Sequence, residues 1–379
     1  MKKLGLTIFF DSFALMLLGL LIVMSASSTY SVFKFDSVFY LFNSHLFKVF
    51  IGIAAIILFA FIPYDIYRSL SKPAIIATTI LLVVTLFFAQ DIKGAGRWLS
   101  LGIISIQPAD IARLVLIVHL AVLIEDKAHV IDNYRHGFLY LFIWIMSISG
   151  LIMLQPNISS GIMLILITLV LIYAGGAKFK HILGSVLLSG LAIGLVAMIF
   201  SHSRSRILAY ANSIINGGDL NFQVKQALLS FGSGGIFGVG IGNSMQSNLF
   251  LPEAYGDFIF AILGEELGLI GTIAVLLAYL VLFVAGILVA KKAKDQFGQL
   301  LAFGITISIV FYAFVNVAVT TGILPTTGLP LPFISYGGTS LIFLCISVGI
   351  LINIAFTNHM RDNGVVYVKD DSNRDEINR

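Results

Sequence analysis

The chain has 379 residues, of which 58% are hydrophobic and only 11% are charged, and its mean hydropathy is +1.00. Soluble domains carry about 25% charged residues, so this chain lacks the polar groups needed to cover a water-soluble globule. The basic residues behind the net charge of +4 are scattered between apolar runs, which argues against nucleic acid as a partner. The single cysteine excludes a disulfide framework.

About ten apolar runs follow one another, each about long enough to cross a hydrocarbon core that needs roughly 20 helical residues. Backbone groups in lipid must hydrogen-bond internally, so the expected fold is all-α and polytopic, with about ten transmembrane helices. The first run resembles a cleaved signal peptide, but the many further runs favour a retained first helix. The expected spans are 8–29, 46–63, 74–90, 107–124, 137–154, 158–176, 182–200, 258–290, 299–323 and 338–357.

An even number of spans places both chain ends on the same side of the membrane. The loops on that side hold most of the lysines and arginines, including the cluster at 291–294, so that side is expected to be cytoplasmic. The longest extramembrane piece, 201–257, then forms an extracellular or periplasmic loop between helices 7 and 8. We expect 1–360 to form one transmembrane domain and 361–379 to form a polar cytoplasmic tail.

Two charged residues, Asp110 and Arg113, stand inside the fourth expected span. They are three positions apart, so they share a helix face and can form an ion pair. A charge inside a span costs at least about 2.5 kcal/mol, which leaves two interpretations: a pair that holds helices in register, or a pair at a polar cavity. Just before them, Arg97 and Trp98 suit the headgroup region at a helix end.

The long outer segment contains basic and amide side chains that suit an anionic headgroup or a pyrophosphate. They are Arg204, Arg206, Gln223, Lys225 and Gln226. The glycines at 232–242 lack the strict spacing and the βαβ context of a dinucleotide-binding motif, so we expect them to permit tight turns instead.

Acidic residues gather at the end of this segment and in the eighth span. We expect Asp257, which follows Glu253, in the first turn of a long helix, where an acid either caps the helix or acts chemically at the outer surface. Glu265 and Glu266 lie two turns deeper. Glu265 is about 80° around the helix from Asp257 and Glu266 is nearly opposite, so at most one of them can share its site.

The segment 324–340 interrupts two apolar runs with three prolines and three glycines. Irregular backbone near membrane depth is tolerated only where protein or water covers it. This segment, which includes Ser335 and Tyr336, is therefore expected to be a re-entrant loop that lines a cavity.

Several uncommon segments in a fixed order make the sequence resemble the SEDS family (shape, elongation, division and sporulation) of FtsW and RodA lipid II polymerases. The run 238–243 is closer to the division branch, FtsW. The family often has Glu and Lys where Asp110 and Arg113 stand, and Asp where this chain has Asn157. The resemblance covers nearly the whole chain and rests on Gly-Ala-x-Arg-Trp at 94–98, Gln107-Pro108, Gln223, Gln226, 232–235, 251–268 and 324–340.

The resemblance implies a peptidoglycan glycosyltransferase that joins two lipid II molecules outside the membrane. It would form a β-1,4 bond with inversion and release undecaprenyl pyrophosphate. The implied partners are a class B penicillin-binding protein and other divisome or elongasome proteins, in the bacterial cell membrane at the division septum. The resemblance fixes no cofactor, and a divalent cation, Mg²⁺ or Mn²⁺, is the one candidate.

These implications assign roles to individual side chains. Asp257 is the expected catalytic carboxylate, as a general base or as a ligand of a divalent cation. Asp110, Arg113 and Glu265 are expected to line or support the cavity. Substrate contacts are expected from Arg97, Arg204, Arg206, Lys225, Gln223, Gln226, Glu253, Ser335 and Tyr336.

Three alternatives stay open: a lipid II flippase, an elongation polymerase of the RodA type, and a non-catalytic scaffold. A flippase needs polar groups along a path between both membrane faces. The unusual polar residues of this chain gather on the expected outer side, which favours an enzyme that faces outward. A scaffold would have no need of Asp257.

Overall fold

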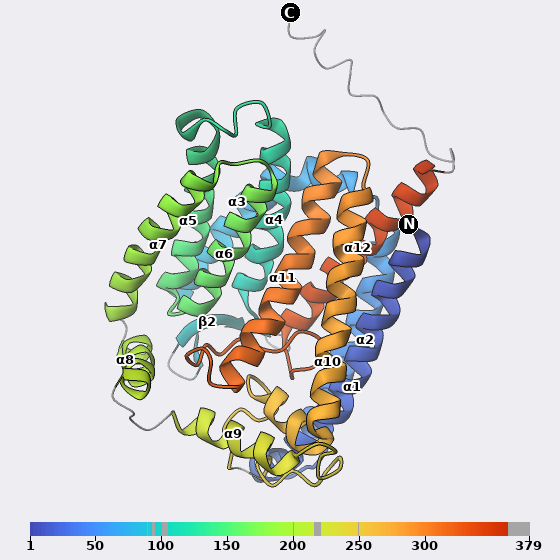
Figure 1. The fold of residues 1–379 in the computed structure, drawn as a ribbon, viewed down its shortest axis with the longest axis vertical. Helices are drawn as coiled ribbons and strands as arrows, with labels where there is room; N and C mark the ends of the chain where they lie inside the picture. The colour runs from blue at the N-terminus through green and yellow to red at the C-terminus, as the bar shows by residue number, and fades with distance from the viewer. Residues whose placement is uncertain are drawn as a thin grey trace, which may run out of the picture.

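The computed structural model describes residues 1–88, 90–92, 95–100, 105–199, 201–215, 221–248 and 250–362. This part of the chain folds as a bundle of long helices whose axes are roughly aligned with one another (Figure 1). The N-terminus and the end of the last helix lie at one end of the bundle, and α8 (Ser201–Ile215) and α9 (Phe222–Gly234) lie at the other.

A small β-sheet and a π-helical turn interrupt the helical pattern. Within the described residues, β1 (Gln90–Ile92), β2 (Ala95–Ser100) and β3 (Ser105–Ile106) pair antiparallel in the order β1-β2-β3. The π-helical turn η1 (Tyr134–Phe138) leads into α5. The long helices are α1 (Lys2–Phe35), α2 (Tyr40–Phe61), α3 (Asp65–Phe88), α4 (Pro108–Asp126), α5 (Leu139–Leu154), α6 (Ile158–Ala174), α7 (Phe179–Ile199), α10 (Ile259–Lys292), α11 (Gln296–Thr320) and α12 (Thr339–Asp362).

The helices coincide with the predicted spans. Seven of the described helices are long and apolar enough to cross a membrane: α1, α2, α3, α5 with its π-helical turn, α10, α11 and α12. α6 and the apolar start of α7 are shorter, and α4 contains the charged residues of the fourth predicted span. The all-α polytopic class is confirmed, while the number of crossings stays a prediction. The small sheet was not predicted; it occupies the connection between α3 and α4, which has no long apolar run.

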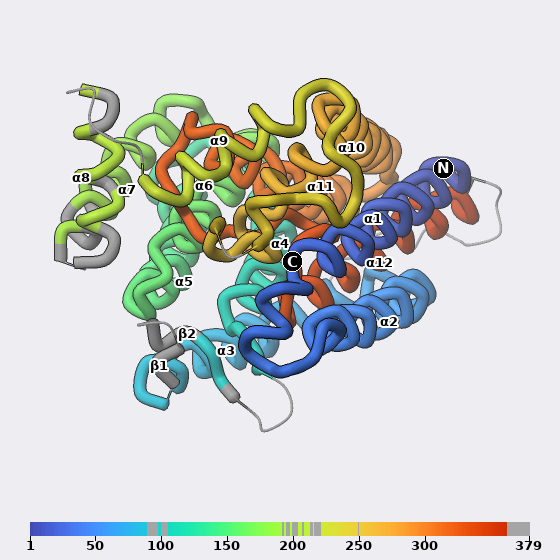
Figure 2. The backbone as a smooth tube through the Cα atoms, turned by 90° about the horizontal axis from the view of Figure 1, so that it is seen from below, coloured from blue at the N-terminus to red at the C-terminus, as the bar shows by residue number. Residues whose placement is uncertain are grey.

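The predicted outer loop 201–257 contains two helices rather than irregular backbone alone. α9 begins where the Asn221 side chain accepts a hydrogen bond from the backbone N–H of Gln223 at 3.0 Å, a common way to start a helix. After α9 the chain makes a series of turns in which Gly238 has a φ of 80°. Figure 2 shows α9 and these turns covering one end of the bundle, where α9 packs against α10 and α11.

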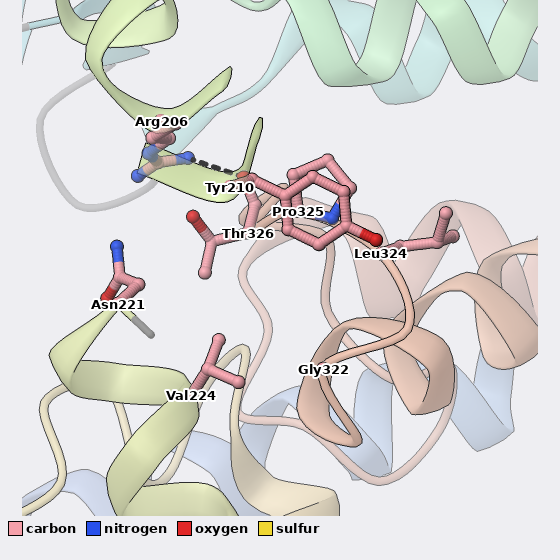
Figure 3. A pocket seen from close by; sticks show the side chains of 8 residues that line it. All are labelled: Arg206, Tyr210, Asn221, Val224, Gly322, Leu324, Pro325 and Thr326. Carbon is pink, nitrogen blue, oxygen red and sulfur yellow. Dashed lines mark hydrogen bonds between the residues drawn. The ribbon is translucent and has the colours of Figure 1, made fainter. Parts of the chain in front are cut away.

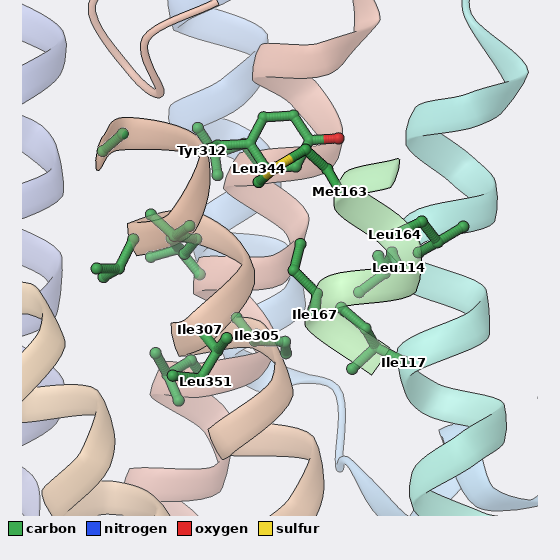
Figure 4. Packing of buried hydrophobic residues seen from close by; sticks show 14 of the residues in the cluster. Leu114, Ile117, Met163, Leu164, Ile167, Ile305, Ile307, Tyr312, Leu344 and Leu351 are labelled. Carbon is green, nitrogen blue, oxygen red and sulfur yellow. The ribbon is translucent and has the colours of Figure 1, made fainter. Parts of the chain in front are cut away.

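The hydrophobic core lies between α4, α6, α11 and α12. Figure 4 shows Ile117, Leu164, Ile305 and Leu351 from these helices packed together, and all four are buried. Helices α2 and α3 instead expose many large apolar side chains, of which Phe61 is 80% exposed. Exposed phenylalanines on a helix of this length are expected where the neighbour is lipid rather than water.

Candidate active site

A cavity of about 960 Å³, lined by both polar and apolar side chains, lies at the end of the bundle that holds α8 and α9. Its wall comes from α2, α4, α6, α8, α9, α11 and α12, from the turns before α10 and from the irregular segment 326–338 between α11 and α12. The prediction that the 324–340 segment lines a cavity is therefore confirmed. A smaller adjoining pocket, which shares Arg206 and Thr326 with the cavity, is shown in Figure 3.

Two irregular segments of the wall are held together by hydrogen bonds. The Asn316 side chain of α11 donates to the carbonyl oxygens of Asp257 and Leu329, both at 2.8 Å. The Ser335 hydroxyl donates to the carbonyl oxygen of Gly256 at 2.8 Å, and the backbone N–H of Tyr336 donates to that of Tyr255 at 2.9 Å. Because these donors are buried or half-buried, the backbone around Asp257 is fixed before any ligand arrives.

Asp257 and Arg206 approach the same point of the wall. A Cβ atom added at Gly328 would lie 3.3 Å from Asp257 Oδ2 and 4.0 Å from Arg206 Nη1. Gly328 has a φ of 75°, which a residue with a side chain rarely adopts. Glycine at 328 thus leaves both charged groups facing the cavity, where both are part of the lining.

The local position of Asp257 differs from the one predicted. The N-cap of α10 is Phe258, without a side-chain capping hydrogen bond, so Asp257 precedes the helix instead of lying in its first turn. The helix starts late because the chain first turns at Glu253, whose φ is 58° and whose carbonyl oxygen accepts from the N–H groups of Gly256 and Phe258. Asp257 is therefore not the N-cap residue of α10.

Of the predicted outer cations, Arg206 is the one that the described structure places in the cavity wall. Its Nη1 donates to the carbonyl oxygen of Thr326 at 3.3 Å (Figure 3). Arg204 and Lys225 are exposed and lie outside the lining. The backbone of Arg97 belongs to β2, but its side chain lies outside the described part of the structure.

The amide and hydroxyl candidates divide in the same way. Gln223, at the start of α9, lines the cavity, whereas Gln226 is not part of its wall. Glu253, Ser335 and Tyr336 all line it. Burial, and then the nearby Glu253 carboxylate, raises the pKa of the Tyr255 phenol, so this hydroxyl is neutral at physiological pH.

The predicted pair of Asp110 and Arg113 is formed and also belongs to the wall. Arg113 Nη2 lies 3.8 Å from Asp110 Oδ1, and the guanidinium stacks 4.3 Å from the centre of the Tyr312 ring on α11. Asp110 and Arg113 both line the cavity, as does Asn157 at the start of α6. The two interpretations left open by the sequence are therefore compatible, since one pair joins α4 to α11 and faces the cavity.

Glu265 supports the outer loop and is not part of the cavity wall. It is 2% exposed and accepts hydrogen bonds from the Ser244 hydroxyl at 2.6 Å and from the backbone N–H of Met245 at 3.1 Å. Its neighbour Glu266 accepts from the Ser25 hydroxyl and from the backbone N–H of Gly242. Both carboxylates therefore hold the turns after α9 against α10. Glu265 does so through Ser244 and Met245, and Glu266 does so through Gly242.

Lys48 of α2 lines the cavity and was missed by the sequence analysis, which treated 46–63 as an uninterrupted apolar span. Its Nζ donates to the Tyr336 hydroxyl at 3.2 Å and lies 4.3 Å from the centre of that ring. The signal available in the sequence was one lysine inside an apolar run, the same kind of signal that singled out Asp110 and Arg113.

The described residues contain no cluster of three or more His, Cys, Asp or Glu side chains that could hold a metal ion. Asp257 and Glu253 both line the cavity, and a Cβ atom added at Gly256, next to Asp257, would lie 3.4 Å from Glu253 Oε2. Hard divalent cations such as Mg²⁺ often combine one or two protein carboxylates with phosphate oxygens of a substrate. This donor set fits a cation that is shared with a phosphate-bearing ligand.

The bundle and its cavity define a class: a polytopic α-helical membrane protein with a cavity lined by charged side chains at one end of its helices. The family model FTSW_RODA_SPOVE, described as "Cell cycle protein", matches residues 6–360. The match covers most of the chain, which therefore belongs to this family.

Two relatives illustrate the relationship. The chain is 36% identical over 356 residues to "Probable peptidoglycan glycosyltransferase FtsW" of Geobacter metallireducens, covering 93% of this chain and 95% of the relative. It is 36% identical over 345 residues to "Stage V sporulation protein E" of Bacillus subtilis, covering 90% and 94%.

Solved structures show the same fold. The rod shape determining protein RodA of Thermus thermophilus aligns with a TM-score of 0.68 at 23% identity over 93% of this chain and 96% of that one. A chain from the study "Structural coordination of polymerization and crosslinking by a peptidoglycan synthase complex" aligns with a TM-score of 0.75 at 22% identity, covering 93% and 97%.

Proposed function

We propose that this chain polymerises lipid II into glycan strands at the outer surface of the bacterial cell membrane. Peptidoglycan glycosyltransfer is the activity named for relatives that are 32% to 36% identical over most of the chain. The proposal for the site rests on one observation: the carboxylate of Asp257 and the guanidinium of Arg206 both lie close to Gly328 and line the same cavity.

The chemistry requires a base and a cation close together. The 4-hydroxyl of the acceptor GlcNAc attacks C1 of the donor MurNAc and forms the β-1,4 bond. The bond from C1 to the pyrophosphate oxygen breaks, and the undecaprenyl pyrophosphate leaves with the electron pair. Asp257 accepts the proton of the attacking hydroxyl, while Arg206 offsets the charge of the leaving pyrophosphate.

A divalent cation gives Asp257 a second proposed role. Asp257 and Glu253 would hold such a cation, and the cation would neutralise the charge of the leaving pyrophosphate. The carboxylate of Asp257 is required in both roles, so its removal tests the site and the addition of a chelator separates the roles. Activity that resists the chelator would favour the base.

We further propose that the chain acts in septal synthesis together with a class B penicillin-binding protein, which would cross-link the strands. Both termini would be cytoplasmic and α8 and α9 would lie outside. A flippase is less well supported, because the charged groups that line the described cavity gather at one end of the bundle instead of along a path between both faces.

The test uses the purified chain in liposomes, with and without its partner synthase, and labelled lipid II, with polymer read on a gel. Asp257→Asn preserves shape but removes the charge, and we expect at least about a 100-fold loss of polymerisation. Asp36→Asn is the matched control, because Asp36 is exposed, lies outside the cavity and has a φ of 52°, which asparagine tolerates. Near-normal polymerisation by folded Asp257→Asn would rule out the assigned role.

A further inference from the structure

We propose that Lys48, with Ser44 and Tyr336, forms a second anion-binding site in the α2 wall of the cavity. The ligand would be the phosphate or pyrophosphate group of a membrane lipid that enters the cavity. This inference rests on the proposed function in one respect, which is that the lipid is taken to be one of the two lipid-linked substrates.

Within the described residues, the charge of Lys48 has no acidic partner. Of the described cations that line the cavity, Arg113 is paired with Asp110, and Arg206 lies near Asp257, since both are close to Gly328. Lys48 makes no ion pair with a carboxylate in the described part of the chain. A lysine in a membrane span costs at least about 2.5 kcal/mol and is normally compensated by a partner, so an anionic ligand is the missing group.

The hydrogen bonds around Lys48 leave donors directed at the cavity. One ammonium N–H donates to the Tyr336 hydroxyl, and that hydroxyl donates to Ser44 Oγ, both at 3.2 Å. The ammonium then has two donors left and the Ser44 hydroxyl has one. Ser44 and Lys48 are four residues apart, so they lie on one face of α2, and both line the cavity. Several free donors and one positive charge match the acceptors of a phosphate.

Tyr336 holds this arrangement in place. Its backbone N–H is bound to the carbonyl oxygen of Tyr255, and its ring packs against the rings of Tyr255 and His45, each 5.7 Å away between centres. A lysine in a span commonly extends toward the lipid headgroups. Here the ammonium lies over the Tyr336 ring, which directs it into the protein.

The position of Lys48 relative to Arg206 indicates what the second site would contribute. Arg206 is on α8 and Lys48 is on α2, so the two cations approach the cavity from different helices. The proposed reaction brings together two lipid-linked molecules, and each has a pyrophosphate. One cation beside Asp257 and one on the α2 wall allow both pyrophosphates to be held in one cavity.

Binding of undecaprenyl pyrophosphate to the purified full-length chain tests the site without catalysis. Lys48→Met should weaken binding by about 10- to 100-fold, the equivalent of losing one charged hydrogen bond, while Lys48→Arg should retain most of it. Lys34→Met is the matched control: Lys34 also donates to a tyrosine hydroxyl, at the same 3.2 Å, but it is exposed and outside the cavity. Equal binding by Lys48→Met and wild type, or equal weakening by Lys34→Met, would overturn the proposal.

Competition with phosphatidylglycerol distinguishes the two lipid sources. We expect a tenfold excess of this phospholipid to leave undecaprenyl pyrophosphate bound, whereas equal displacement would show an ordinary headgroup site and overturn the substrate assignment. Polymerisation of lipid II is measured in parallel, and the KM of Lys48→Met should rise more than its kcat falls. An inactive wild type would contradict the proposed function, while an active wild type with an unchanged Lys48→Met would contradict only the role of Lys48.

Discussion

At the scale of single residues, the direction in which a side chain points decides whether it belongs to the cavity wall. Arg204 and Arg206 lie in the same helix, α8, and have the same chemistry, yet only Arg206 lines the cavity. Two positions along a helix correspond to a rotation of about 200°, so the two side chains leave on nearly opposite faces. Their roles in substrate binding should therefore differ.

Arg206→Ala is expected to lower kcat/KM for lipid II by about 10- to 100-fold, because a hydrogen bond to a charged group contributes about 1.5–3 kcal/mol. Arg206→Lys, which keeps the charge but not the planar fork, should fall between alanine and wild type. Arg204→Ala should stay within about twofold of wild type, since surface changes usually have small effects. Equal losses in both alanine variants would contradict the assignment to Arg206.

The pair of Asp110 and Arg113 makes a separate prediction, about stability. Arg113→Met leaves the Asp110 carboxylate buried without its partner, and breaking a buried pair in this way costs about 3–5 kcal/mol. The double variant with Asp110→Asn should recover much of the lost thermal stability, measured by fluorescence-detected gel filtration after heating. A double variant that is less stable than Arg113→Met would show that the residues do not act as a pair.

At the scale of elements, the turns after α9 are inserted into a break in α10. Gly268 has φ 65° and ψ −163° inside this helix. Around it, the N–H of Val239 donates to the carbonyl oxygen of Glu265 at 2.9 Å, and the N–H of Leu269 donates to that of Gly235 at 2.9 Å. The turns thus satisfy the backbone groups that the break leaves open, and the outer segment is fixed to the helix that follows Asp257.

Gly268→Ala should lower stability by about 2 kcal/mol or more, because φ is positive and the new Cβ would lie 2.4 Å from the backbone nitrogen of Gly238. The control is Gly150→Ala in α5, where an added Cβ meets no atom within 4 Å. Unfolding midpoints in detergent should fall for the first variant and not for the second. An unchanged midpoint for Gly268→Ala would mean that the break is not required.

At the scale of the whole molecule, polar contacts mark both ends of the bundle. The end opposite the cavity has a network in which Arg361 of α12 binds Asp295 at 2.9 Å and Arg68 of α3 binds Glu125 of α4 at 3.1 Å. The network ties together the ends of α3, α4, α11 and α12 at the side that the lysine bias predicts to be cytoplasmic. The proposed function requires the cavity to be on the other side.

Cysteine labelling tests this orientation in intact cells. Phe237→Cys, at a position 81% exposed beside α9, should react with an impermeant maleimide added outside, and Ala128→Cys, exposed after α4, should react only after the membrane is opened. The native Cys345 is buried and should give little background. Labelling of Ala128→Cys alone from outside would reverse the proposed orientation.

Local features of the sequence were sufficient for the class, the approximate spans and several site residues. Long apolar runs exclude a soluble fold whatever their packing, and the three-residue spacing of Asp110 and Arg113 predicts a pair on any helix. The prolines and glycines of 324–340 likewise indicated irregular backbone, which needs cover by protein or water. Each of these inferences depends on neighbouring residues alone.

Convergence of distant segments was decided only by the tertiary structure. Arg206, Asp257 and Lys48 come from separate elements, so whether they face one cavity depends on long-range packing. The sequence could not show that Glu265 fastens a loop, because its partners Ser244 and Met245 reach it only when the turns fold back onto α10. The sequence shows only which residues are adjacent along the chain. The role of each of these side chains depends on contacts with residues from other helices, which form only when the bundle folds.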